Sequence, residues 1–220
     1  MCQPISNSML LYTFGDSFTY GYELLDPVNS AWPTVLSKKL NADVINHARP
    51  GVDNDFIIET VINSISKQKP DLAIIAWTSA SRRQFYDEHG TYVTWPGHIT
   101  KDKHTHRNTL TKYITAHNNE RLEYRRWLLQ VILLQTFLQQ HNIKYYFVNT
   151  FDNQQRYAKY SVEFDNYIKQ ITIERFIGWP DLGIVEWCYK YKLAPGGHPL
   201  EQGHAAIAEK IFTFLKQDDH

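Results

Sequence analysis

Two short motifs near opposite ends of the 220-residue chain carry residues that can do chemistry. Ser17 closes a Gly-Asp-Ser motif after an apolar run, and His198 lies in a Pro-Gly-Gly-His-Pro loop before a helical pattern. A serine hydroxyl becomes a nucleophile when a base takes its proton, and a loop histidine can act as that base near neutral pH. Alone, Gly-Asp-Ser is also typical of a turn followed by an N-cap serine. The prediction of nucleophilic catalysis therefore depends on both motifs.

Further candidates follow two other apolar runs. Gly51 lies in a Pro-Gly turn, where a glycine lets a backbone N–H approach a substrate oxygen closely. Asn54 either fixes this loop or caps the next helix. Trp77 offers a ring that can stack on a sugar, and Arg82 offers a guanidinium for a carboxylate or phosphate, with core packing and plain solvation as the alternatives. Together with Asp16, which precedes Ser17, these three side chains (Asn54, Trp77 and Arg82) are the expected substrate contacts.

Hydrophobic periodicity predicts strands alternating with helices. Buried strands are expected at residues 9–14, 44–48, 72–77, 145–149 and 184–187. Helices are expected at residues 32–40, 53–68, 122–141 and 200–215, with residues 151–176 helical in part. This alternation is typical of a mainly parallel sheet covered by helices on both faces. Such sheets bind ligands at the carboxyl ends of their strands, which is where the candidate residues lie.

Residues 80–119 interrupt this rhythm, and we interpret them as a functional insertion within a single domain that spans residues 1–220. The segment is polar and rich in histidine. His104 and His106 are two residues apart, a spacing that can bind a metal on a strand, but no cysteine or carboxylate cluster lies nearby. We expect a surface loop there and no metal. His204, inside the last predicted helix, is expected to be structural or to face solvent.

In their order along the chain, Gly-Asp-Ser at Ser17, Gly51 with Asn54, and His198-Pro before the last helix resemble the sequence blocks of the SGNH/GDSL hydrolase family. The resemblance spans nearly the whole chain. It implies a flavodoxin-like three-layer α/β/α sandwich and an esterase, lipase, thioesterase or carbohydrate deacetylase that needs no cofactor. It also implies that Ser17 is the nucleophile, that His198 is the base, and that the N–H groups of Ser17 and Gly51 line the oxyanion hole.

Two blocks depart from the family pattern. Where the family has Gly-x-Asn-Asp after the third strand, this chain has Trp-Thr-Ser, and Ser79 best matches the asparagine that completes the oxyanion hole, with Thr78 as the fallback. Where the family has Asp-x-x-His, Pro195 stands at the aspartate position. These variants look similar to a divergent branch of the family associated with tailed phages.

The loss of that aspartate leaves open which group orients the imidazole of His198. A backbone carbonyl is favoured, because the Pro-Gly-Gly loop leaves main-chain oxygens free beside the ring. A relocated carboxylate is the alternative, with Glu186 the first choice ahead of Asp181 and Glu201. Without a carboxylate to stabilise the imidazolium, we expect slow turnover of unactivated esters and continued activity on esters with good leaving groups.

The bulk composition excludes some classes of function. Lys plus Arg and Asp plus Glu number 23 each, so the chain has no general attraction to nucleic acid or to acidic membranes. Cys2 and Cys188 are interpreted as free thiols in a reducing compartment. Without a signal-peptide or transmembrane pattern, we expect a cytoplasmic protein, for which a phage-encoded origin is consistent. The oligomeric state is open.

Three functions fit these observations. The favoured one is hydrolysis, through an acyl-enzyme, of small acyl groups such as acetate on a carbohydrate, because the aromatic and polar insertion suits a sugar better than a lipid tail. An acyltransferase, in which a sugar hydroxyl replaces water, is the second. The third is a carbohydrate-binding or structural module with a decayed site, against which the presence of both Ser17 and His198 argues.

Overall fold

The structure, a computed structural model, describes residues 8–88, 90–98, 105–151 and 153–218. At its centre is a sheet of five parallel strands in the order β2-β1-β3-β6-β7, which is the flavodoxin-like order. The strands are β1 (Met9–Phe14), β2 (Ala42–Asn46), β3 (Leu72–Trp77), β6 (Tyr145–Asn149) and β7 (Phe176–Ile177). The predicted α/β class with a mainly parallel sheet is confirmed.

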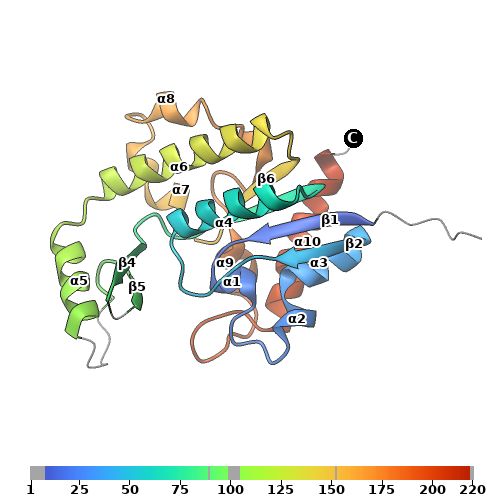
Figure 1. Cartoon of the computed structure of the whole chain (residues 1–220), viewed down its shortest axis with the longest axis horizontal. Helices are drawn as coiled ribbons and strands as arrows, with labels where there is room; N and C mark the ends of the chain where they lie inside the picture. Colours follow the sequence, from blue (N-terminus) through green and yellow to red (C-terminus); the bar gives the residue numbers. More distant parts are fainter. Residues whose placement is uncertain (1–7, 89, 99–104, 152, 219–220) are drawn as a thin grey trace, which may run out of the picture.

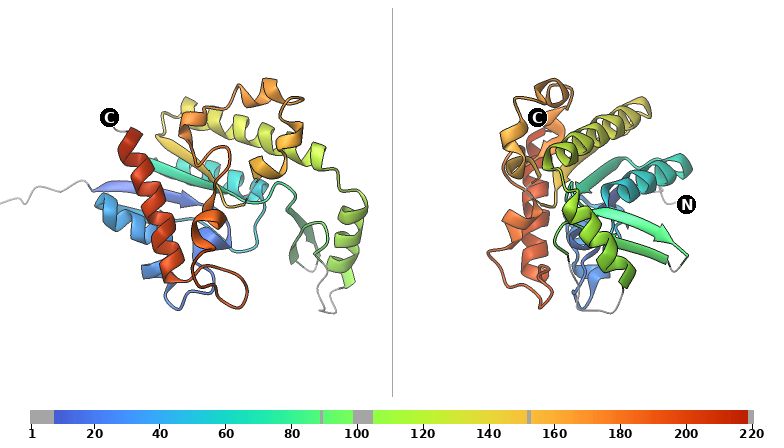
Figure 2. Two further views of the ribbon diagram at one scale, coloured as in Figure 1. Left: turned by 180° about the vertical axis from the view of Figure 1, so that it is seen from behind. Right: turned by 90° about the vertical axis from the view of Figure 1, so that its left-hand side faces the viewer.

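Helices cover both faces of this sheet (Figure 1, Figure 2). Side chains alternate between the two faces of a strand, so the odd-numbered residues of β3 join one apolar cluster and the even-numbered residues join the other. A strand buried on both faces is apolar throughout, as β3 is. The covering helices are α4 (Asn54–Lys67) and α6 (Glu120–Gln140) on the first face, and α3 (Trp32–Leu40) and α10 (Glu201–Asp218) on the second.

Most elements lie where the sequence predicts them. The bounds of β1, α3, β3 and β6 are as predicted, and α4, α6 and α10 differ only at their ends. The second strand was predicted two residues too late, because α3 ends in a left-handed turn at Asn41 and β2 begins directly after it. The shorter helical segments are α1 (Ser17–Tyr20), α2 (Pro27–Ser30), α7 (Asn153–Arg156) and α8 (Asp165–Ile168), with 3₁₀ turns at Ala158–Tyr160 and Ile173–Arg175.

The strand predicted at residues 184–187 is wrong. This segment is the helix α9 (Ile184–Cys188), and the fifth strand is β7. A short apolar run does not distinguish strand from helix by its periodicity. Here the local capping favours the helix, because Glu186 Oε2 accepts the backbone N–H of the N-cap residue Gly183 at 2.7 Å, which is one half of a capping box.

The predicted insertion forms a hairpin and a helix that project from the body (Figure 1). They are β4 (Arg83–Asp87), β5 (Gly90–Thr94) and α5 (Thr105–Ala116). A buried hydroxyl pair, Thr94 and Thr111 at 2.5 Å, ties the hairpin to the helix. His104 lies outside the described residues, as does the side chain of His106, and in the part of the chain that is described no three His, Cys, Asp or Glu residues gather as a metal site.

Two further expectations concern the membrane and the cysteines. Among the helices of the described residues, none has the length and apolarity that crossing a bilayer requires.

Cys188 is a free, buried thiol whose pKa is raised to about 12 by burial, whereas Cys2 lies outside the described residues.

His204 joins the last helix to the third. Its side chain is fully buried, and its Nδ1 accepts the backbone N–H of Trp32 at 3.1 Å. Burial lowers the pKa of this imidazole to about 4, so the ring is neutral in the folded protein. Of the two roles expected for His204, the structure favours the structural one.

This burial predicts a pH-dependent stability. The unfolded chain takes up a proton at His204 below pH ~6.5, whereas the folded chain resists protonation down to pH ~4, so the free energy of unfolding should fall by about 3 kcal/mol across that interval. Urea unfolding at several pH values measures the slope. His204→Asn, which keeps an acceptor for Trp32, should flatten it, and His117→Asn, at an exposed histidine, should not. Equal slopes in wild type and His204→Asn would contradict this account.

Candidate active site

Ser17 lies where the chain leaves the carboxyl end of β1. Asp16 caps α1, because its Oδ1 accepts the N–H of Phe18 at 3.0 Å, and the serine becomes the first residue of that helix. The helix then ends after one turn, since Gly21 and Tyr22 both donate their N–H groups to the Ser17 carbonyl. Gly21 is in the left-handed region with φ 85°, which lets the chain reverse at this point. Ser17 is thereby held at the rim of the sheet, where it is buried but lines a pocket.

His198 reaches Ser17 from a tight turn before α10. Ala194 and His198 are joined by a backbone hydrogen bond across this turn, and Gly197 adopts φ 90° within it. The imidazole Nε2 lies 2.9 Å from Ser17 Oγ. The two residues are 181 positions apart in the sequence, and the fold brings them into hydrogen-bond contact.

The other ring nitrogen of His198 contacts a carboxylate that the sequence did not indicate. His198 Nδ1 lies 2.6 Å from Glu23 Oε2, and Gly196 donates its N–H to Glu23 Oε1 at 2.9 Å. Because the carboxylate only accepts, Nδ1 carries the proton and Nε2 is left to accept from Ser17. The hydrogen bond from His198 is the main cause that lowers the pKa of Glu23, followed by that from Gly196, so the group is ionised.

This contact overturns the expectation that a backbone carbonyl orients the ring. The named carboxylate candidates were wrong as well, since Glu186 is engaged in capping α9. Glu23 lies in the turn that follows Ser17, and no motif in the sequence marks it. Glu23 adopts φ 69°, a left-handed conformation that non-glycine residues seldom adopt, and this turns its side chain back to the loop of His198. Gly196 leaves room for it, because a Cβ there would lie 2.5 Å from Glu23 Oε2.

The loop after β3 is clamped by two asparagines. Asn54 accepts the N–H of Thr78 at 2.9 Å and donates to its carbonyl at 3.2 Å. Asn153 donates to the same carbonyl and accepts the N–H of Ala80 at 3.0 Å. The backbone on both sides of Ser79 is therefore held by hydrogen bonds, at Thr78 and at Ala80. The sequence interpretation missed Asn153, which comes from α7 and carries no motif.

Ser79 and Thr78 face different surroundings. The Thr78 hydroxyl is buried and donates to Asp16 Oδ2 at 2.6 Å, so it is engaged away from Ser17. Ser79 lines the same pocket as Ser17 and His198, and its hydroxyl lies 3.1 Å from that of Ser81. Of the two hydroxyls proposed for the oxyanion hole, only that of Ser79 is on the pocket.

The solved structures with the same fold include esterases. A psychrotrophic esterase from Pseudoalteromonas sp. is 12% identical with a TM-score of 0.56, and 94% of this chain and 97% of that one are covered. A carbohydrate esterase family 2 enzyme with a carbohydrate binding domain, from Corynascus thermopiles (Myceliophthora fergusii), is 12% identical with a TM-score of 0.60, covering 99% and 68%. A member of the lipolytic protein G-D-S-L family from Veillonella parvula DSM 2008 is 15% identical with a TM-score of 0.52, covering 96% and 100%.

These likenesses show the fold that the sequence blocks imply. No curated protein matches the sequence. A family of unknown function, DUF6071, matches residues 26–219. The chain belongs to this family. In this DUF6071 protein the matched residues include the loop of His198 but not Ser17 or Glu23.

Three residues expected to touch substrate in this DUF6071 protein are placed elsewhere. Trp77 is fully buried in the core against Phe147, which accounts for its ring without a ligand. Asp16 is also fully buried, and Asn54 is buried in the clamp described above. The three are corrected to structural roles. A strand that is buried on both faces leaves no surface at Trp77. Asn54 is engaged by backbone, and Asp16 by the backbone of Phe18 and the hydroxyl of Thr78.

Of the two remaining candidates, Arg82 is on the pocket of Ser17, and Gly51 is not among the residues that line it. Arg82 lines the pocket of Ser17, together with the aromatic residues Phe18, Trp95, Phe151 and Tyr189. Gly51 is exposed with φ 72°, in open space, a conformation that suits a glycine.

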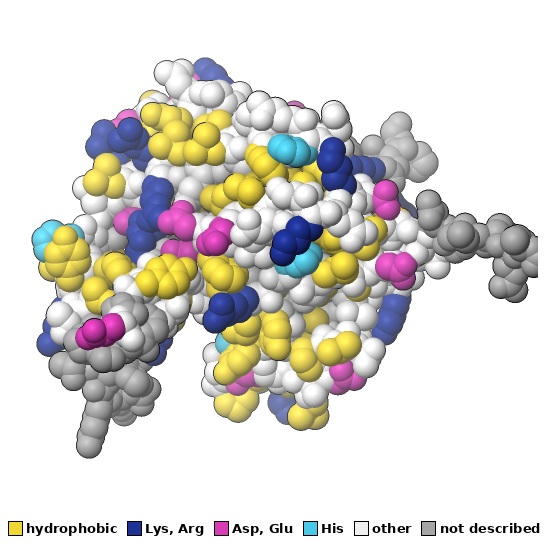
Figure 3. Space-filling view, in the orientation of Figure 1, with side chains coloured by type: hydrophobic (Ala, Val, Ile, Leu, Met, Phe, Trp, Pro, Cys, Tyr) yellow, Lys and Arg dark blue, Asp and Glu magenta, His cyan; other side chains and the backbone are white. Residues whose placement is uncertain are grey.

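The pocket of the DUF6071 protein has a volume of about 420 Å³. The insertion supplies Trp95 and Pro96 to one wall, and the loop of His198 supplies the opposite one. In the space-filling view the molecule is notched between the insertion, at lower left, and the loops near α1 and α2 (Figure 3).

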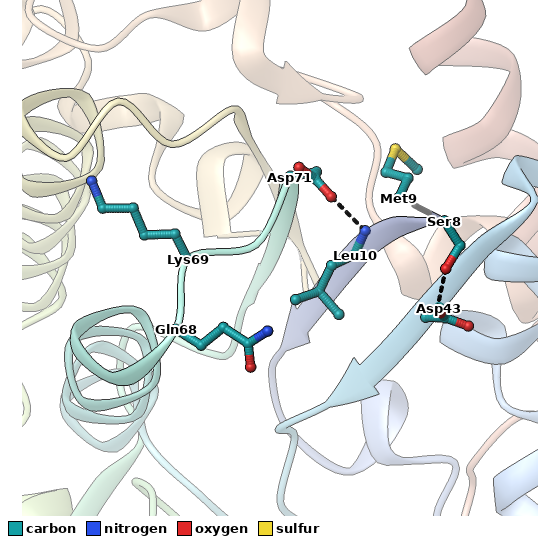
Figure 4. Close-up of a pocket in the computed structure, with 7 residues that line it drawn as sticks. All are labelled: Ser8, Met9, Leu10, Asp43, Gln68, Lys69 and Asp71. Carbon is teal, nitrogen blue, oxygen red and sulfur yellow. Dashed lines mark hydrogen bonds between the residues drawn. The ribbon is translucent and has the colours of Figure 1, made fainter. Parts of the chain in front are cut away.

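A second hollow, of about 700 Å³, lies at the opposite end of the strands (Figure 4). Its polar groups are already paired, since Asp71 accepts the N–H of Leu10 at 2.7 Å and Ser8 donates to Asp43. No nucleophile and base meet there among the described residues, so the larger hollow is not the candidate site.

The Glu23 contact predicts a spectroscopic signature. A short Nδ1–H···O hydrogen bond to a carboxylate should give a low-field imidazole N–H resonance in proton NMR, and Glu23→Gln should shift or remove it because the charge is lost. Glu186→Gln should leave it in place. A wild-type spectrum without the resonance, with His198 assigned, would argue that the ring is not held by Glu23.

Proposed function

We propose that this protein is a serine esterase in which Ser17, His198 and Glu23 form the catalytic triad. The observation that carries the proposal is the single imidazole that contacts Ser17 Oγ at 2.9 Å and Glu23 Oε2 at 2.6 Å. This is the order nucleophile, base and orienting acid that acyl transfer by serine requires. The fold shared with esterases supports the same chemistry.

The geometry suits a two-step reaction. Ser17 Oγ attacks the acyl carbon of the ester while His198 Nε2 takes its proton, and Glu23 stabilises the imidazolium that forms. The imidazolium then gives the proton to the departing alcohol, which leaves an acyl group on Ser17. Water attacks this acyl-enzyme while His198 takes its proton. The imidazolium then returns that proton to Ser17 Oγ as the carbon–oxygen bond to Ser17 breaks, which releases the acid and restores the serine. Because a carboxylate orients the ring, the slow turnover expected of a dyad is no longer expected.

The oxyanion hole in this proposal combines two backbone N–H groups, those of Ser17 and Gly51, with the Ser79 hydroxyl. If Ser81 donates its proton to Ser79, the proton of Ser79 is left for the oxyanion, and the 3.1 Å separation of the two hydroxyls permits this arrangement. Asn54 and Asn153 fix the loop, so Ser79 needs little reorganisation when the charge develops.

The proposed substrate is a small acyl ester, acetate being favoured, on a carbohydrate. A pocket of about 420 Å³ is at the lower end of the range for small-molecule sites. Its aromatic residues can stack on a sugar face. The intact set of Ser17, His198 and Glu23 argues against a decayed site. The left-handed backbone of Glu23, at φ 69°, costs conformational energy, and such conformations cluster at functional sites.

The decisive experiment uses a neutral fluorophosphonate probe, which reacts only with an activated serine. The wild-type chain should be labelled at Ser17 and should hydrolyse 4-nitrophenyl acetate. Ser17→Ala should lose both activities with an unchanged circular dichroism spectrum, and Ser66→Ala, at an exposed serine of α4, should lose neither. Labelling that persists in Ser17→Ala would refute Ser17 as the nucleophile.

A second experiment tests the role of Ser79. Removing one oxyanion donor typically lowers kcat by about a hundredfold or more, and it should change KM little because the donor acts mainly in the transition state. Ser79→Ala is therefore expected to lower kcat for 4-nitrophenyl acetate to that extent. An unchanged kcat would assign the hole to backbone groups alone.

A further inference from the structure

The charged side chains that line the pocket are both arginines. Arg82 precedes β4 and Arg156 ends α7, and among the described residues no carboxylate lines the pocket with them. The chain as a whole has no net charge, so a lining with two arginines and no carboxylate is a property of this site. Charges attract more strongly in a pocket partly screened from water than on an open surface. The site therefore favours a ligand with negative charge.

Arg82 is held rigidly. Its Nη1 lies 3.4 Å from Asp16 Oδ2 and 3.3 Å from the Val52 carbonyl oxygen. Its guanidinium carbon lies 5.2 Å from the ring centroid of Trp95 and 5.6 Å from that of Phe151, and its side chain is only 11% exposed. A guanidinium fixed in this way loses little conformational entropy when it binds. In the described part of the chain no acceptor engages Nη2, which leaves that nitrogen available to a ligand oxygen.

Arg156 is only partly neutralised. It lies 3.6 Å from Glu120 Oε1, while Lys159 takes the other oxygen of the same carboxylate at 2.7 Å. One carboxylate therefore faces two cations. The side chain of Arg156 is 42% exposed, so it can move toward a ligand in the pocket that it lines.

We propose that the substrate carries a carboxylate or phosphate on its alcohol part, which Arg82 and Arg156 bind while Ser17 attacks the acyl carbon. The chemical class is an O-acylated acidic sugar or a sugar phosphate. Guanidinium groups match the oxygens of both anions. A small acyl group leaves most of the pocket to the alcohol part, where the aromatic residues lie. This inference rests on the proposed function and narrows its substrate.

The test compares three acetate esters that differ in one substituent. They are 4-acetoxybenzoate, 4-acetoxyphenyl phosphate and the neutral 4-acetoxybenzamide, and the two charged esters distinguish carboxylate from phosphate. Wild type should show a kcat/KM about tenfold higher for at least one charged ester than for the neutral one, mainly through KM, since a hydrogen bond to a charged group contributes about that factor. The preference should weaken in high salt.

The variants separate recognition from structure. Arg156→Gln should bring the ratio of charged to neutral kcat/KM close to one, and Arg156→Lys should restore part of it. Arg82→Gln should act in the same direction, but it also removes a partner of the buried Asp16, so Arg156 is the deciding position. Arg121→Gln, at a surface arginine paired with Glu163, should keep the wild-type ratio.

Two results overturn the inference alone. Equal kcat/KM values for all three esters, or an unchanged ratio in Arg156→Gln, would refute it, while fluorophosphonate labelling and turnover of the neutral ester would show that the proposed function stands. A wild-type chain that takes up no fluorophosphonate overturns the proposed function and this inference together.

Discussion

A buried carboxylate, Asp16, connects the parts of the site. A carboxylate that is removed from water must be supplied with hydrogen bonds, and each donor that supplies Asp16 comes from a different segment. The donors are the backbone of Phe18 in the nucleophile turn, the hydroxyl of Thr78 after β3, and the guanidinium of Arg82 in the pocket. Satisfying one group therefore fixes the nucleophile, the loop of Ser79 and the cation of the pocket relative to one another.

The parallel sheet explains why these segments meet. Parallel strands end at the same edge, so the segments after β1, β2 and β3 converge, and the α7 segment after β6 adds Asn153 and Arg156 there. The apolar clusters on the two faces hold the strands in register, while the loops at the edge carry the polar residues. Stability and chemistry thus occupy different parts of the same chain. The insertion adds a wall to the pocket, and of its described residues only Ala80, at its start, belongs to either of these clusters.

The elements with long apolar patterns could be predicted from the sequence, because burial imposes that pattern directly. The segment of α9 could not, since a short run containing Ile, Val and Trp has the composition of a strand and its helical state depends on a cap. Ser17 and His198 could be proposed because each lies in a recognisable loop. Glu23 could not, because its role depends on a left-handed backbone conformation that no residue type in the turn signals. Trp77 was wrongly expected to contact substrate, because a tryptophan at the end of a strand can either pack in the core or line a pocket.

The placement of Glu23 divides the proposed triad unevenly along the chain. Ser17 and Glu23 are close in sequence, and His198 lies 175 residues beyond Glu23. Cleavage of the backbone within the insertion would therefore leave one fragment with Ser17 and Glu23 and the other with His198. Neither fragment holds an activated serine, and α10 must dock beside α3 before the imidazole reaches both partners. A reactive hydroxyl at Ser17 would therefore require groups from both halves of the chain in one folded body.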